Sequence, residues 1–153
     1  MKHLLSALMA LALFISCSSN DKEENIDYVS KNDKEITDYI AKNKLTAQKS
    51  DSGLYYIINE SGTGTQPTAT SNVTVAYKGY FTNGTVFDQS SAAGISFPLN
   101  RVIKGWTEGI PYFKTGGSGV LLIPAHLGYG NNDSGSIPGG SVLIFDVKLI
   151  SVN

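Results

Sequence analysis

The chain has 153 residues and a hydrophobic content of 41%, which suffices for one ordinary domain with an extension and leaves no room for a second core. Its formal net charge of −1 at pH 7 gives no electrostatic reason to expect nucleic acid as a partner. Two histidines and a single cysteine are too few for a clustered metal site, and the sequence indicates neither a metal nor another cofactor.

Residues 1–16 have the pattern of a signal peptide, because a basic start precedes an apolar run that is too short to span a bilayer. The segment ends in Leu-Phe-Ile-Ser before Cys17, which resembles the lipobox of bacterial lipoproteins, with Phe14 where Leu is usual. The resemblance implies that Cys17 is acylated and anchors the protein in a membrane of the cell envelope. We expect the outer membrane, with the domain periplasmic or surface-exposed. Alternatively, Cys17 is an incidental residue near an ordinary cleavage site.

Residues 17–31 are expected to form a flexible tether. The stretch 18–25 is small, polar and acidic and contains no apolar residue, as is typical of a solvated linker. An acidic cluster directly after a lipid-bearing cysteine also resembles the surface-export signal of some lipoproteins. The sequence leaves both interpretations open.

Residues 32–52 are expected to form an N-terminal helix and a polar connector. Asn32 and Glu35 have the spacing of a capping box, and we predict a helix over about 33–43. Its apolar stripe consists of Ile36, Tyr39, Ile40 and Leu45. This stripe could dock on the following domain, space the domain from the membrane or form a dimer.

The remaining domain, residues 53–153, is dominated by the alternating pattern of β-strands. Strands are predicted over 54–58, 73–80, 85–89, 119–123 and 141–150, and an Asn-Gly pair at 83–84 predicts a hairpin turn. One stretch differs: around 102–110, the only tryptophan, Trp106, lies at helical spacing from Ile110 and Phe113. This order predicts an α+β fold, in which a curved antiparallel sheet of about five strands wraps around one short α-helix.

The sequence lacks the residues for ordinary covalent or acid–base catalysis. Asp88 and Asp146 are isolated carboxylates, and His126 alone makes little case for a nucleophile triad, so we assign it to a loop or rim. No glycine-rich loop opens a helix to bind phosphate. The domain instead has many aromatic side chains distributed around its one helix.

Seven blocks of the domain, in order, resemble the FK506-binding-protein type (FKBP-type) of peptidyl-prolyl cis-trans isomerase. They are Val-Ala-Tyr-Lys-Gly at 75–79, Gly-Thr-Val-Phe-Asp-Gln-Ser at 84–90, Phe-Pro-Leu at 97–99, Val-Ile-Lys-Gly-Trp-Thr-Glu-Gly at 102–109, Ile-Pro-Ala-His-Leu-Gly-Tyr-Gly at 123–130, Ile-Pro at 137–138 and Leu-Ile-Phe-Asp-Val at 143–147. The resemblance covers nearly the whole domain and implies the same α+β fold.

The resemblance also implies an apolar pocket between sheet and helix. Trp106 would be the floor of this pocket, and Tyr77, Phe87 and Phe145 would be its walls. Val102 and Ile103 would lie at the entry to the helix, and Tyr129 and Ile137 would come from the long loop. Asp88 would be the one buried acid. Ile95 stands where the family often has an aromatic residue, and we leave it out of the predicted pocket.

Such a pocket suits prolyl isomerisation without a nucleophile. Resonance across the X-Pro bond sets a barrier of roughly 18–20 kcal/mol, whereas cis and trans differ by only about 0.5–1 kcal/mol. The twisted transition state is less dipolar than the planar ground state, so an apolar, water-poor site favours it. The expected partners are proline-containing polypeptides, and FK506-type macrolides are candidate inhibitors.

A competing hypothesis is a binding module without turnover. The same pocket could hold proline-containing segments as a holdase, and from composition alone Trp106, Phe87 and Phe145 could simply be core. The joint occurrence of the blocks favours the enzyme, which would assist the folding of exported proteins.

Overall fold

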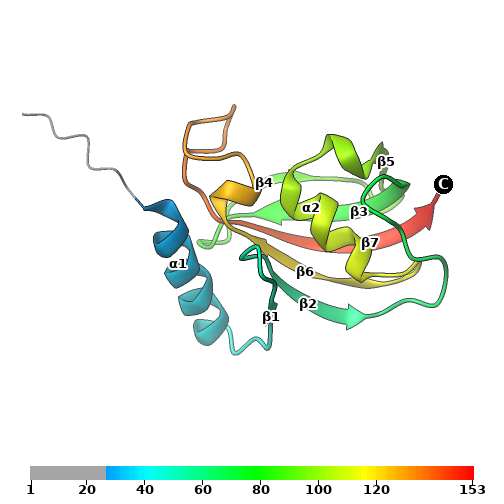
Figure 1. The fold of residues 1–153 in the computed structure, drawn as a ribbon, viewed down its shortest axis with the longest axis horizontal. Coiled ribbons are helices and arrows are strands. Elements are labelled where there is room, and N and C mark those ends of the chain that lie inside the picture. The colour runs from blue at the N-terminus through cyan, green and yellow to red at the C-terminus, as the bar shows by residue number, and fades with distance from the viewer. Residues whose placement is uncertain (1–26) are drawn as a thin grey trace, which may run out of the picture.

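The computed structural model describes residues 27–153, and it has a single sheet with helices on both sides (Figure 1). The predicted signal peptide, the lipidation site at Cys17 and most of the predicted tether lie outside these residues. The strands are β1 Gln48–Lys49, β2 Tyr55–Glu60, β3 Asn72–Tyr80, β4 Val86–Gln89, β5 Ile95–Pro98, β6 Ser118–Ile123 and β7 Leu143–Val152. The helices are α1 Tyr28–Lys42, α2 Lys104–Gly109 and three short 3₁₀ turns, η1 Leu99–Arg101, η2 Ile110–Tyr112 and η3 Ala125–Leu127.

The predicted α+β fold is confirmed. Every strand pair is antiparallel, in the order β1-β2-β6-β7-β3-β4, with β5 also paired to β3. Within residues 27–153 the sheet has seven strands instead of the expected five or so. The two additional strands, β1 and β5, have two and four residues, too short to show a clear alternating pattern.

Alternate residues of the central strands pack on opposite faces of the sheet. On β6 and β7, Leu121, Ile123 and Phe145 face α2, whereas Leu122 and Ile144 belong to a second apolar cluster with Ile36 of α1. This follows from the two-residue period of a strand. The sheet is therefore covered by α2 on one face and partly by α1 on the other.

Two glycines let α2 approach the sheet closely. A Cβ atom on Gly105 would lie 2.6 Å from Cγ2 of Ile123, and one on Gly109 would lie 2.7 Å from Cδ2 of Leu121. The helical spacing of these glycines puts both on the face toward β6. Trp106, between them, is consequently held low against the sheet and is only 5% exposed.

The start of α1 differs from the prediction. The helix begins at Tyr28, and the carboxylate of Asp27 caps it by accepting the N–H groups of Val29 and Ser30 at 3.1 and 3.2 Å. The predicted cap at Asn32 is therefore wrong, because Asp27 already serves the first turn. Residues 28–31, which we assigned to the tether, are helical.

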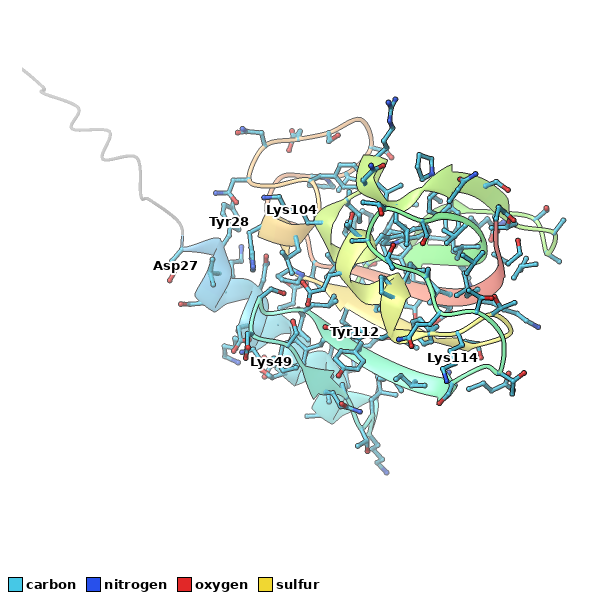
Figure 2. The ribbon with its side chains drawn as sticks, turned by 45° about the vertical axis from the view of Figure 1, so that its right-hand side comes forward. Asp27, Tyr28, Lys49, Lys104, Tyr112 and Lys114 are labelled. Carbon is cyan, nitrogen blue, oxygen red and sulfur yellow. The ribbon has the colours of Figure 1, made fainter. Side chains whose placement is uncertain are left out.

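The apolar stripe of α1 docks on the domain, as one of the three alternatives proposed. Ile36 is fully buried, and Tyr39 and Ile40 pack around it on the second sheet face. At the near edge of the sheet, Lys49 donates to Asp33 of α1 at 2.6 Å (Figure 2). Among the described residues, no helix is both long and apolar enough to cross a membrane.

Candidate active site

A cavity of about 700 Å³ lies between α2 and the concave face of the sheet. All nine residues predicted for the pocket line it: Tyr77, Phe87, Asp88, Val102, Ile103, Trp106, Tyr129, Ile137 and Phe145. They come from β3, β4, β7, α2 and the segment that leads into it, and the loop between β6 and β7. The structure therefore brings the predicted set together, and the role of each residue stays a prediction.

The base of the cavity is a cluster of aromatic rings around Trp106. Tyr77 and Phe145 meet the indole edge to face, with centroid distances of 5.0 and 5.1 Å, and Phe97 lies at 5.3 Å. Phe87 extends the cluster through an edge contact with Phe145 at 5.5 Å. Such contacts fix ring orientations beyond what burial alone does, so the apolar surface is preformed.

Gly79 on β3 makes room for two of these rings. A Cβ atom there would lie 2.7 Å from both Phe87 and Phe145. Real Cβ atoms do not approach ring carbons so closely, so a larger residue would displace the rings. The glycine in the Val-Ala-Tyr-Lys-Gly block is thus explained by the shape of the pocket wall.

One hydrogen-bonded polar pair lies at the side of this apolar surface. The Tyr77 hydroxyl donates to Oδ2 of Asp88 at 2.6 Å. Asp88 itself is exposed, so the prediction of a buried acid is wrong: the carboxylate lies on the short strand β4, at the open side of the cavity. Burial, and then the hydrogen bond to Asp88, raise the pKa of Tyr77 well above its usual value. The phenol therefore stays protonated and keeps donating, and the ring is held against Trp106.

Three donors at the cavity have no partner within residues 27–153. They are the backbone N–H of Ile103, the hydroxyl of Tyr129 and the buried indole N–H of Trp106. The indole N–H is the buried side-chain donor of the three, and an unpaired buried donor is unfavourable unless a ligand supplies an acceptor. Tyr129 is 47% exposed, so its hydroxyl is accessible to a ligand. The site can therefore bind carbonyl groups over an apolar floor.

The cavity has further lining residues that we did not predict: Ile95, Phe97, Arg101 and residues 134–136. Ile95 and Phe97 share one face of β5 because they are two residues apart. Recognition of β5 as a strand would have identified both. For Arg101 and the loop serines, the sequence carries no signal.

The loop from Pro124 to Gly140 supplies Tyr129 and Ile137. Ser134 and Ile137 pair through two backbone hydrogen bonds of 2.9 and 3.0 Å, which shapes the tip of the loop. His126 does not reach the cavity. It lies in η3 within this loop, and its Nε2 atom is 2.9 Å from the Ser52 carbonyl oxygen, so of the two assignments, loop or rim, the structure supports the loop.

The described part of the chain contains no group of three or more His, Cys, Asp or Glu residues arranged to hold a metal ion. Together these features make a preformed apolar cavity with a few carbonyl-binding donors. It suits an extended ligand that is apolar and rich in carbonyl groups.

The comparisons with known proteins agree with this geometry. Residues 63–150 match the family model described as FKBP-type peptidyl-prolyl cis-trans isomerase. The chain is 42% identical over 125 residues to the FKBP-type isomerase FkpA of Aeromonas hydrophila, covering 79% of this chain and 47% of the relative. It spans about half the length of the curated relatives that it matches.

Two solved structures are also similar. The crystal structure of FkpA from Escherichia coli has a TM-score of 0.68 at 38% identity, covering 81% of this chain and 63% of that one. A peptidyl-prolyl cis-trans isomerase from Pseudomonas syringae pv. tomato has a TM-score of 0.70 at 30% identity, covering 82% and 96%.

Proposed function

Because this chain belongs to the FKBP-type peptidyl-prolyl cis-trans isomerases, we propose that its aromatic cavity accelerates the rotation of X-Pro bonds in exported polypeptides. The observation that carries the proposal is the assembly of all nine predicted residues around one preformed apolar cavity. No nucleophile is required, because the reaction breaks no covalent bond. The cavity needs only to bind the twisted prolyl bond better than the planar one.

The apolar floor and the donors have separate tasks in this mechanism. The proline ring would rest on Trp106, where water is excluded and the less dipolar twisted amide is favoured. The Ile103 N–H and the Tyr129 hydroxyl would bind substrate carbonyls and hold the peptide in a bent pose. Asp88 acts through Tyr77, which it orients with the 2.6 Å hydrogen bond.

A protease-coupled assay with a short Leu-Pro or Phe-Pro peptide tests the proposal. We expect the protein to accelerate isomerisation, and Tyr129→Phe to lower kcat/KM by roughly three- to tenfold, the effect of losing one hydrogen bond. Tyr56→Phe is the matched control, because the hydroxyl of Tyr56 binds Gln48 outside the cavity. FK506-type macrolides, if they fill the cavity, should inhibit the reaction.

The competing function is a proline-binding holdase without turnover. A folded protein that binds the peptide but does not accelerate isomerisation would establish that function and reject the enzyme. Equal activity of Tyr129→Phe and the unmodified protein would reject the assignment of Tyr129 while leaving the enzyme intact.

We further propose that the protein is a lipoprotein of the cell envelope, anchored through acylated Cys17. The support is the Leu-Phe-Ile-Ser-Cys segment, which ends an apolar run of signal-peptide length. Metabolic labelling with a radioactive fatty acid should label the protein, and Cys17→Ser should abolish the label and release the protein from membranes. Labelling that survives in Cys17→Ser would contradict the proposal.

A further inference from the structure

Asn32 is the one polar residue with a fully buried side chain in the described part of the chain. It lies in the second turn of α1, far from the cavity in sequence, and it does not line the cavity. A buried amide is retained without cost only when its donor and acceptor are both satisfied. The partners of Asn32 therefore indicate what the residue does.

Both partners belong to the loop that carries Tyr129 and Ile137. The Asn32 amide nitrogen donates to the carbonyl of Gly140 at 2.9 Å, and its oxygen accepts from the N–H of Ala125 at 2.8 Å. Ala125 and Gly140 stand at the beginning and the end of this loop. One side chain thus joins the two ends.

Two backbone hydrogen bonds complete a closed ring. The Gly140 N–H donates to the Gly130 carbonyl at 2.9 Å, and the Gly130 N–H donates to the Ala125 carbonyl at 2.8 Å. The ring therefore runs through Asn32, Gly140, Gly130 and Ala125 and returns to Asn32. It divides the loop into two lobes, with Tyr129 in the first and Ile137 in the second.

Tyr28 adds a steric contact next to the ring. Its side chain extends from the start of α1 toward the loop (Figure 2), and it lies so close to Gly140 that a Cβ atom there would overlap the phenol ring. Gly140 also has a φ of +74°, which favours glycine. A side chain at position 140 would therefore collide with Tyr28 and push the start of α1 away from this end of the loop.

We propose that Asn32 is a positioning residue for the isomerase pocket, which closes the hydrogen-bonded ring and so fixes the lobes that present Tyr129 and Ile137. The inference rests on the proposed function of the cavity. In this account α1 is part of the active-site architecture, because a donor held on a loop acts well only when the loop is preorganised.

The first test compares Asn32→Ala with Ile36→Val in the full chain. Ile36 is buried one turn further along the same helix and makes only apolar contacts, so its variant loosens α1 without opening the ring. Asn32→Ala should lower kcat/KM for a Pro peptide by roughly tenfold and speed amide exchange at Gly130 and Gly140. Ile36→Val should change turnover by less than about twofold and leave those two amides protected.

The second test uses the unmodified protein and so does not depend on a variant that folds. Native-state hydrogen exchange at increasing denaturant should show Gly130, Gly140 and the amides of α1 opening together, with one denaturant dependence. If Gly130 and Gly140 exchange independently of α1, or if Asn32→Ala leaves their protection and turnover unchanged, the inference is wrong. A protein without isomerase activity would reject the proposed function, whereas the exchange data would still decide whether the ring exists.

Discussion

Two tyrosines of strand β3 each donate to an aspartate on a neighbouring strand, one at the pocket and one away from it. Tyr77 donates to Asp88 at the cavity, and Tyr80 donates to Asp146 at 3.0 Å on the opposite face of the sheet. The two pairs have the same chemistry, and their tyrosines lie three residues apart on the same strand. They therefore provide a matched comparison at the level of single residues.

We predict that Asp88→Ala and Asp146→Ala have similar effects on stability and different effects on turnover. Each removes the acceptor of one partly exposed phenol, so each should cost about 1 kcal/mol of the free energy of unfolding. Only Asp88→Ala frees the Tyr77 ring over Trp106 and should lower kcat/KM severalfold. Denaturant unfolding and the peptide assay measure both effects, and an equal loss of turnover in the two variants would argue against a role for Asp88.

The same two tyrosines predict how stability depends on pH. Burial, followed by the neighbouring carboxylate, raises the pKa of Tyr77 and of Tyr80 above the unfolded value of about 10. The folded state thus binds the two phenolic protons more tightly than the unfolded state does. The resulting contribution to the free energy of unfolding is fully present below about pH 10 and is lost as the pH rises through the higher pKa values of the folded state. In an absorbance titration, Tyr77→Phe and Tyr80→Phe should each remove one phenolate transition that occurs above about pH 10 in the unmodified protein. A Tyr77 transition at or below the ordinary pKa would contradict the hydrogen bond to Asp88.

At the scale of elements, the contact between α2 and β6 sets the height of the cavity floor. Glycine in a helix is unfavourable by about 1 kcal/mol relative to alanine, yet Gly105 faces the fully buried Ile123 at a distance that excludes a methyl group. The close approach of helix and sheet therefore outweighs helix propensity at this position.

Gly105→Ala should consequently destabilise the protein despite its better helix propensity. Overpacking costs about 1–3 kcal/mol, so we expect a net loss of about 1–2 kcal/mol together with a changed fluorescence of Trp106, the only tryptophan. Lys104→Ala, on the exposed side of the same turn, is the control and should change neither. If Gly105→Ala were stabilising, the helix would have room to move that the structure does not show.

The elements that the sequence predicted correctly are those whose own pattern is strong. The long strands and the Trp106 helix belong to this class, since their periodicity directly reflects the face they bury. The start of α1 was misplaced because Asn32 and Glu35 mimic a capping box, while the true cap, Asp27, has Ser30 instead of Glu or Gln at the third helical position. Asn32 instead donates a hydrogen bond to the carbonyl of Gly140. No local sequence pattern predicts a partner so distant in sequence.

At the scale of the whole molecule, the cavity collects residues from segments between positions 77 and 145. Their assembly could be predicted through the resemblance to a family, because spacing alone does not reveal which rings of distant strands meet. Arg101 and residues 134–136 also line the cavity but were not predicted. They lie in turns, where the sequence has neither a periodic pattern nor a motif of the family. The ring at Asn32 likewise emerges only from the folded chain.

The central claim is that the cavity catalyses prolyl isomerisation and does not merely bind proline. The most direct measurement is exchange NMR on a proline peptide with a small amount of the protein, which detects interconversion without a coupled protease. Uncatalysed exchange takes tens to hundreds of seconds, so cross-peaks between the cis and trans signals within about a second would establish catalysis, and they should weaken with Tyr129→Phe. Peptide signals that shift on binding and show no cross-peaks would contradict the account and indicate a binding module.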